Sequence, residues 1–182
     1  MGMLKLLCGN IVDDEYLKLA DAIVLPTNPM MRCGAGVSGA IFRKAGVDAL
    51  EQYTELKFGI SYYNPPGMNE MKVGEIRTSP GFALPCEIIF AQGPKAYEYE
   101  SVDEALQALL STYLNILKHA VQLNYKTILL PAIGTGSYGF THSGTARNVI
   151  KLLKDFVANE ELTVYFVVYE QDALDKYSAQ DI

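Results

Sequence analysis

Short apolar runs alternate along this chain with longer segments of helical period, and this alternation limits the folds that the chain can adopt. Strands are predicted at 4–8, 22–26, 74–80, 87–93, 127–133 and 162–170. Several of these runs are uniformly apolar, as expected when both faces of a sheet are covered. Strands that alternate with helices favour an α/β fold, with a largely parallel sheet between two helical layers.

The clearest helix is predicted over 101–123, where Ser101 and Glu104 form a capping box ahead of a leucine-rich stripe. A second long helix is predicted over 142–158. Shorter helices are expected at 13–20, 37–45, 47–57 and 171–177. A chain of 182 residues with 49% hydrophobic residues can fill one core, so we expect one domain over 1–182.

Charge and cysteine usage narrow the classes of function. The net charge of −6 argues against a nucleic-acid groove, because such grooves need a basic field. Cys8, Cys33 and Cys86 are scattered and the chain has only two histidines, which indicates a reduced, cytoplasmic protein without a metal site. No apolar run approaches the length of a membrane span, so no membrane partner is expected.

Residues 32–40, RCGAGVSGA, contain Gly34, Gly36 and Gly39 at the G-x-G-x-x-G spacing of dinucleotide-binding folds. In those folds the first glycine follows its strand almost at once, and an acidic residue ends a second strand about 20 residues later. Here the preceding strand ends near Pro26, and the downstream Glu51 lies in a segment of helical character. A nicotinamide dehydrogenase is therefore a remote alternative, and no cofactor is expected.

Two glycine-rich loops each follow a strand and enter a helix, namely 32–40 and 131–140. The amides at a helix N-terminus favour an anion, so two such loops predict a ligand with two phosphates held by the backbone. This arrangement explains how an acidic protein can bind a diphosphate. The alternative is a pair of unrelated turns.

With these loops in place, the chain resembles the macrodomain family, whose members bind ADP-ribose. The resemblance rests on the order of six blocks: GNI, DAIVLPTN with GAGVSGAIFRKAG, GEIRTSPGFALPCEIIFAQGP, the capped helix, ILLPAIGTGSYGF and VVYE. It implies a three-layer α/β/α sandwich with a mixed, mostly parallel sheet. It also implies ADP-ribose, free or attached to protein, as the partner.

The resemblance also implies roles for individual residues around the diphosphate and the distal ribose. Asn28 matches an asparagine that holds the distal ribose, and its amide adds no negative charge beside a diphosphate. Tyr138 matches a ring over the same ribose. The two loops that match the diphosphate site are Gly34, Ala35, Gly36, Val37 and Ser38 on one side and Ile133, Gly134, Thr135, Gly136 and Ser137 on the other.

The same resemblance places adenine near the ends of the first and last strands. Tyr169 matches an aromatic residue that faces adenine, although its position after Tyr165 and Phe166 on its own favours packing. Asn10 and Ile11 match an Asp-Ile pair whose acidic member accepts a hydrogen bond from the adenine amine. An asparagine accepts that bond less strongly than a carboxylate does.

Two departures bear on catalysis. Leu25 replaces an asparagine that supports the first loop, and Ser38 replaces the aspartate of one hydrolytic class. Serine is no general base without a partner, so we expect hydrolysis of ADP-ribose esters by a bound water, with Asn28 as the catalytic residue. His142 is either a proton shuttle or an ordinary first residue of a helix. A non-catalytic reader of ADP-ribose and a phosphatase acting on ADP-ribose 1″-phosphate are the alternatives.

Overall fold

The structure is a computed structural model that describes residues 1–181. Six strands form one sheet in the order β1-β6-β5-β2-β4-β3. All neighbours are parallel except β3 and β4, which are antiparallel. The predicted mixed, mostly parallel sheet is therefore confirmed. The strands are β1 (Leu4–Cys8), β2 (Ala22–Pro26), β3 (Ile76–Ser79), β4 (Glu87–Ala91), β5 (Thr127–Leu130) and β6 (Thr163–Val168).

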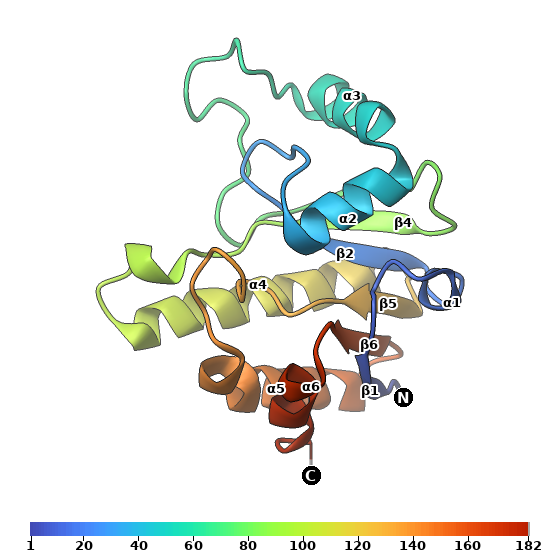
Figure 1. The fold of residues 1–182 in the computed structure, drawn as a ribbon, viewed down its shortest axis with the longest axis vertical. Helices are drawn as coiled ribbons and strands as arrows, with labels where there is room; N and C mark the ends of the chain where they lie inside the picture. Colours follow the sequence, from blue (N-terminus) through green and yellow to red (C-terminus); the bar gives the residue numbers. More distant parts are fainter. Residues whose placement is uncertain (182) are drawn as a thin grey trace.

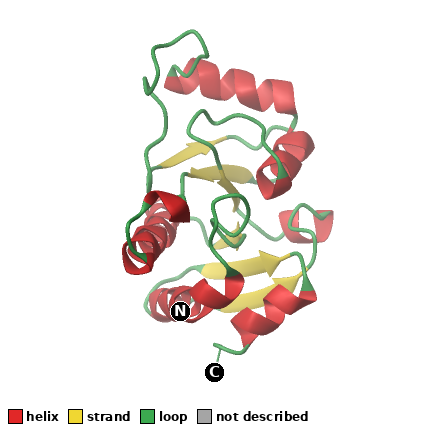
Figure 2. Ribbon diagram, turned by 60° about the vertical axis from the view of Figure 1, so that its left-hand side comes forward, coloured by secondary structure: helices red, strands yellow, loops and turns green. Residues whose placement is uncertain are grey.

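Helices cover both faces of this sheet and give the three layers that the sequence predicts (Figures 1 and 2). Buried side chains of α4, α5 and α6 form one apolar cluster with one face of the sheet, and those of α1, α2 and α3 form another with the opposite face. The helices are α1 (Asp14–Leu17), α2 (Gly36–Ala45), α3 (Val47–Phe58), α4 (Val102–Gln122), α5 (His142–Ala158) and α6 (Gln171–Ser178), with a short 3-10 turn η1 (Ala96–Glu98).

The alternation of side chains along each strand builds these two clusters. In β2, Ala22 and Val24 contribute to the α4–α5 side, while Ile23 and Leu25 contribute to the α2 side. All four side chains are fully buried. A strand covered on both faces has no position for a polar side chain, so polar residues begin only where β2 ends.

Capping residues fix where the two long helices begin. The Ser101 hydroxyl accepts a hydrogen bond from the N–H of Glu104 at 3.1 Å, as the predicted capping box requires. The Thr141 hydroxyl accepts from the N–H of Gly144 at 3.0 Å, so α5 begins at His142 as predicted. No helix within residues 1–181 is long and apolar enough to cross a membrane.

Some predicted boundaries were wrong. The helix expected over 13–20 is only the single turn of α1. The strand expected over 127–133 ends at Leu130, because Pro131 follows and has no N–H for the ladder. The last strand ends at Val168 rather than residue 170, so Tyr169 lies just beyond it.

Candidate functional site

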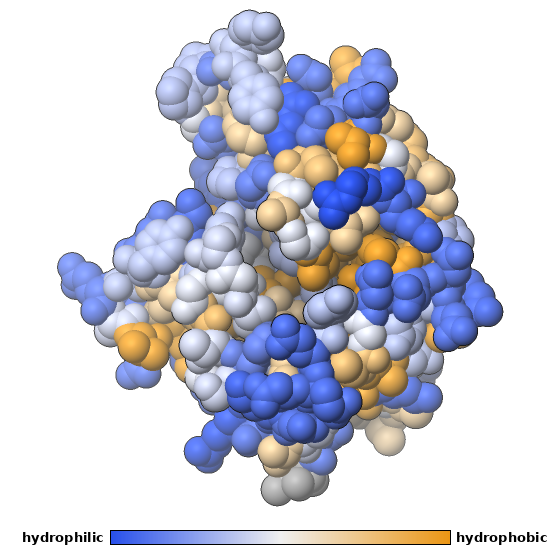
Figure 3. Space-filling model, viewed as in Figure 1, coloured by the Kyte–Doolittle hydropathy of each residue, from blue (hydrophilic) through white to orange (hydrophobic). Residues whose placement is uncertain are grey.

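A cavity of about 550 Å³ opens at the carboxyl ends of the central strands β2, β4 and β5. The surface in Figure 3 is hollowed between the half that carries α2 and α3 and the half that carries α5 and α6. Ligands of α/β sheets commonly bind at this edge. The lining residues are Pro26, Thr27, Asn28, Gly34, Ala35, Gly36, Val37, Ser38, Gly93, Ala132, Ile133, Gly134, Thr135, Gly136, Ser137 and Tyr138. The structure thus brings all the predicted diphosphate and distal-ribose residues to one cavity.

The first loop, residues 27–38, runs from the end of β2 into the first turn of α2. Gly36 has a φ of 62°, in the left-handed region that favours glycine, and it is the first residue of α2. A Cβ on Gly39 would collide with the carbonyl oxygen of Gly34. The third glycine of the G-x-G-x-x-G pattern therefore lets the loop pack against its own helix, and the first two, Gly34 and Gly36, line the cavity.

The second loop, residues 131–141, joins β5 to α5 on the other side of the cavity. The N–H of Ile133 donates to the Tyr113 hydroxyl of α4 at 2.7 Å. Burial raises the pKa of Tyr113 well above its ordinary value, so this hydroxyl stays neutral. The N–H of Phe140 donates to the carbonyl oxygen of Gly134 at 3.0 Å and closes the turn. The loop is thus fixed at both ends of its glycine-rich part.

Tyr138 is held at the rim of the cavity by contacts that the sequence did not reveal. The Gln92 Nε2 donates to the Tyr138 hydroxyl at 3.3 Å and to the carbonyl oxygen of Gly93 at 3.0 Å. The Lys95 ammonium lies 5.5 Å from the centre of the Tyr138 ring. Gln92 is buried, directly beyond β4, and was missed because a lone glutamine carries no local pattern.

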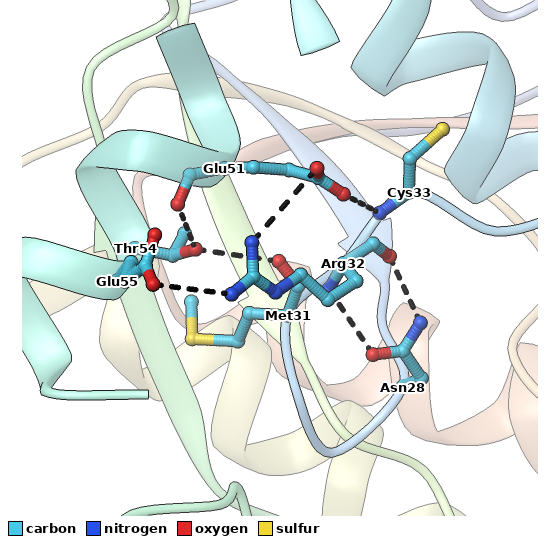
Figure 4. Close-up of polar contacts among 7 residues, drawn as sticks. All are labelled: Asn28, Met31, Arg32, Cys33, Glu51, Thr54 and Glu55. Carbon is cyan, nitrogen blue, oxygen red and sulfur yellow. Dashed lines mark hydrogen bonds and ion pairs between the residues drawn. The ribbon is translucent and has the colours of Figure 1, made fainter. Parts of the chain in front are cut away.

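The Asn28 side chain makes three hydrogen bonds to the main chain of its own loop. Its Oδ1 accepts from the N–H groups of Met30 and Arg32, both at 3.1 Å, and its Nδ2 donates to the carbonyl oxygen of Arg32 at 2.8 Å. Because the amide nitrogen carries two protons, one donor remains available beside Gly34. Figure 4 shows this amide against the main chain of Arg32, with Glu51 and Glu55 of α3 around the guanidinium.

The Ser38 hydroxyl lies buried at the cavity wall and has no hydrogen-bond partner among the described residues. A buried hydroxyl without a partner is unfavourable, so this group needs a ligand or a water molecule. Among the described residues, no side chain that could act as a base lies within hydrogen-bonding distance of it. The Ser38 hydroxyl is therefore available to a ligand as a hydrogen-bonding group of the cavity wall.

The lining carries no carboxylate, imidazole, ammonium or guanidinium group, and Tyr138 is its only titratable residue within the described chain. An anion in this cavity would meet main-chain N–H groups, hydroxyls and the Asn28 amide. No negative side chain of the lining opposes it, although the protein is acidic overall. The described residues also contain no cluster of side chains that could hold a metal ion.

The predicted adenine residues lie outside the cavity lining, beside it at the ends of β1 and β6. The Cys8 thiol lies 3.5 Å from the carbonyl oxygen of Tyr169, so the two chain segments run side by side. Tyr169 is 78% exposed, which leaves its ring free to meet a planar ligand. The Asn10 Oδ1 accepts from the N–H of Val12 at 3.2 Å, and the Ile11 side chain is buried in the core.

His142 is not among the cavity residues. Its Nδ1 lies 3.0 Å from the Tyr177 hydroxyl of α6, and its ring meets the Tyr177 ring edge to face. Burial and, second, the positive charge of Lys176 lower the pKa of His142. The structure thus packs His142, the first residue of α5, against Tyr177 of α6 and outside the cavity lining.

Comparisons with known proteins agree with this geometry. Residues 24–149 match the family described as Macro domain. A macro domain-containing protein of Methanosarcina mazei is 34% identical over 90% of this chain and 82% of its own length. The O-acetyl-ADP-ribose deacetylase of Escherichia fergusonii is 32% identical over 90% of this chain and 89% of its own length. An Oceanobacillus iheyensis macrodomain solved with ADP shares the fold with a TM-score of 0.80 at 24% identity, over 97% of this chain and 88% of that one. The chain therefore belongs to the macro domain family.

Proposed function

We propose that this protein binds ADP-ribose and hydrolyses its esters, in which the acyl group comes from acetate or from an acidic side chain of a protein. The observation that carries the proposal is the composition of the cavity wall. Two glycine loops and one asparagine face each other across a space without a charged side chain. Such a wall suits a diphosphate and an uncharged sugar. The name of the Escherichia fergusonii relative, an O-acetyl-ADP-ribose deacetylase, supports the choice of substrate.

In this proposal the loops of Gly34–Ser38 and Gly134–Ser137 donate main-chain N–H groups to the diphosphate. The free Nδ2 proton of Asn28 donates to a hydroxyl of the distal ribose, and the Tyr138 ring covers that ribose. Tyr169 stacks on adenine, with Asn10 beside it. The fold already holds Asn28, Tyr138 and the second loop in place by hydrogen bonds, which lowers the ordering cost of binding.

The hydrolytic step uses water as the nucleophile. Its oxygen attacks the ester carbonyl carbon, the bond from that carbon to the ribose oxygen breaks, and the ribose oxygen takes up a proton. No side chain of the wall is a suitable general base, so the water must be oriented and deprotonated with help from the substrate's own phosphate. The protein contributes by positioning the substrate for this attack, chiefly through the contact of Asn28 with the distal ribose.

The absence of an acid or base from the described wall also favours a second function, a reader that binds ADP-ribose without turnover. Incubation with a glutamate-linked mono-ADP-ribosylated protein and with O-acetyl-ADP-ribose separates the two. Release of ADP-ribose by the wild-type protein, lost in Asn28→Ala, is the result expected for a hydrolase. Stable binding without release would assign the protein as a reader.

A further inference from the structure

We propose that Glu51 of α3 is a positioning residue for Asn28, acting through the main chain of Arg32 and Cys33. This inference rests on the proposed function, because it concerns how Asn28 reaches the distal ribose. Glu51 does not line the cavity. It lies on α3, which follows the helix that leaves the first loop.

The orientation of the Asn28 amide depends on where the main chain of Arg32 lies. Both the N–H and the carbonyl oxygen of Arg32 bind the Asn28 side chain, at 3.1 Å and 2.8 Å. A displaced Arg32 peptide would turn the amide and redirect its remaining proton. Leu25, buried beneath this loop, has no polar atom to hold it.

Glu51 contacts the peptide group that joins Arg32 to Cys33, and it also contacts the Arg32 side chain. Its Oε2 accepts a hydrogen bond from the N–H of Cys33 at 2.8 Å, and its Oε1 lies 3.9 Å from the Arg32 guanidinium. The Arg32 side chain is only 13% exposed, and the Glu51 side chain is 26% exposed, so solvent screens this pair weakly. Figure 4 shows the carboxylate reaching from α3 to both groups.

Two further contacts attach the same stretch to α3 and its neighbourhood. The Thr54 hydroxyl, one helical turn after Glu51, lies 3.4 Å from the carbonyl oxygen of Met31. The Tyr62 ring lies 4.9 Å from the Arg32 guanidinium and covers it. Residues 31–33 are thus held at three successive positions by groups that lie outside the first loop.

The backbone of Met31 explains why this attachment is needed. Met31 has a φ of 53°, a left-handed conformation that a bulky residue adopts only when its surroundings impose it. The side chain is fully buried. Without Glu51 the loop can relax toward an ordinary backbone conformation, and the Arg32 peptide would move with it.

Glu55 provides a matched control. Its carboxylate also pairs with Arg32, at 3.7 Å, but its side chain is 45% exposed and it makes no main-chain hydrogen bond to the loop. Removing Glu55 therefore removes one negative charge near the Arg32 guanidinium, while the hydrogen bond from Cys33 to Glu51 stays in place. Solvent screening makes the loss small.

Calorimetric titration with ADP-ribose and ADP tests the proposal, since ADP lacks the distal ribose. In Glu51→Ala we expect ADP-ribose affinity to fall about tenfold, the size of one hydrogen bond, and ADP affinity to change less than about twofold. Glu55→Ala should stay within about twofold of wild type for both ligands. The double variant Asn28→Ala with Glu51→Ala should bind ADP-ribose no more weakly than Asn28→Ala alone.

Glu51→Gln keeps an oxygen acceptor for the N–H of Cys33 and should lose less ADP-ribose affinity than Glu51→Ala. If Glu51→Ala does not fold, Glu51→Gln is used instead to compare the losses of affinity for ADP-ribose and ADP. Equal losses for ADP-ribose and ADP, or additive losses in the double variant, would overturn the positioning role. The proposed function would then stand as long as the wild type binds ADP-ribose. A wild type that does not bind ADP-ribose would overturn both.

Discussion

Gln92 donates a hydrogen bond from its buried amide to the Tyr138 hydroxyl at 3.3 Å, joining the end of β4 to the second loop of the cavity. The second bond of the same nitrogen, to Gly93, fixes the direction of the amide. Tyr138 is thereby held in one orientation before any ligand arrives. Preorganisation of this kind raises affinity without adding a contact to the ligand.

Gln92→Leu should therefore weaken ADP-ribose binding severalfold, about as much as one uncharged hydrogen bond, with little change in stability. The stability change is small because the substitution removes a buried polar group whose Oε1 has no partner among the described residues. Titration calorimetry and thermal unfolding measure the two effects. An unchanged affinity for ADP-ribose would mean that the hydrogen bond from Gln92 is not needed to orient Tyr138.

The two glycine loops allow a steric test of the diphosphate site. A Cβ on Gly36 or on Gly136 would meet no heavy atom within 4 Å, and both residues line the cavity. Gly36→Val and Gly136→Val should each block ADP-ribose by filling the space that the diphosphate needs. Only Gly36→Val should also destabilise the fold, by about 1–2 kcal/mol, because its φ is positive.

Unfolding in urea together with calorimetry separates the two effects of these valines. Gly136→Val provides the cleaner comparison, since the φ of Gly136 does not lie in the left-handed region. If Gly136→Val binds ADP-ribose as the wild type does, the second loop does not approach the diphosphate.

Tyr169→Ala tests the adenine contact. The ring is 78% exposed, so its removal should leave the unfolding temperature nearly unchanged. Affinity for ADP-ribose and AMP should fall by about tenfold or less, in line with the loss of one stacked ring, while ribose 5-phosphate should bind as before. Equal weakening of all three ligands would contradict the assignment of adenine to this ring.

His142 should make stability depend on pH. Its pKa is lowered in the folded state, chiefly by burial, so the unfolded chain takes up a proton first as the pH falls. Its stabilising contribution is therefore present in full above the unfolded pKa of about 6.5 and is lost as the pH falls toward the lower folded pKa. Urea unfolding between pH 7.5 and pH 5 should show a smaller loss of stability in His142→Asn than in the wild type. An equal loss would mean that other groups cause the dependence.

The sequence predicted the elements whose patterns are local. All six predicted strands and both predicted long helices are present in the structure. They could be predicted because apolar periodicity and the Ser101 cap are patterns that span only a few residues. The antiparallel direction of β3 against β4 joins neighbouring segments of the chain but has no signal in the apolar pattern of either strand. The order of the strands depends on contacts between segments far apart in the sequence. Here the family resemblance supplied the mixed sheet that the periodicity alone could not.

The cavity wall was predicted as a set of residues, while its supports were not. Glu51 was expected on a helix and lies on α3, yet nothing in its neighbourhood in the sequence indicates the bond to Cys33. The bond of Gln92 to Tyr138 spans 46 residues and that of Tyr113 to Ile133 spans 20, against 18 for Glu51 and Cys33. Contacts of this kind follow from the packing of elements far apart in sequence, and so they emerge only with the fold.

Calorimetric titration of the wild-type protein with ADP-ribose, beside AMP and NAD, tests the central claim most directly. The cavity geometry predicts one ADP-ribose site per chain, with tighter binding of ADP-ribose than of either other ligand. Absence of ADP-ribose binding, or tighter binding of NAD, would contradict the claim that the two glycine loops form an ADP-ribose site.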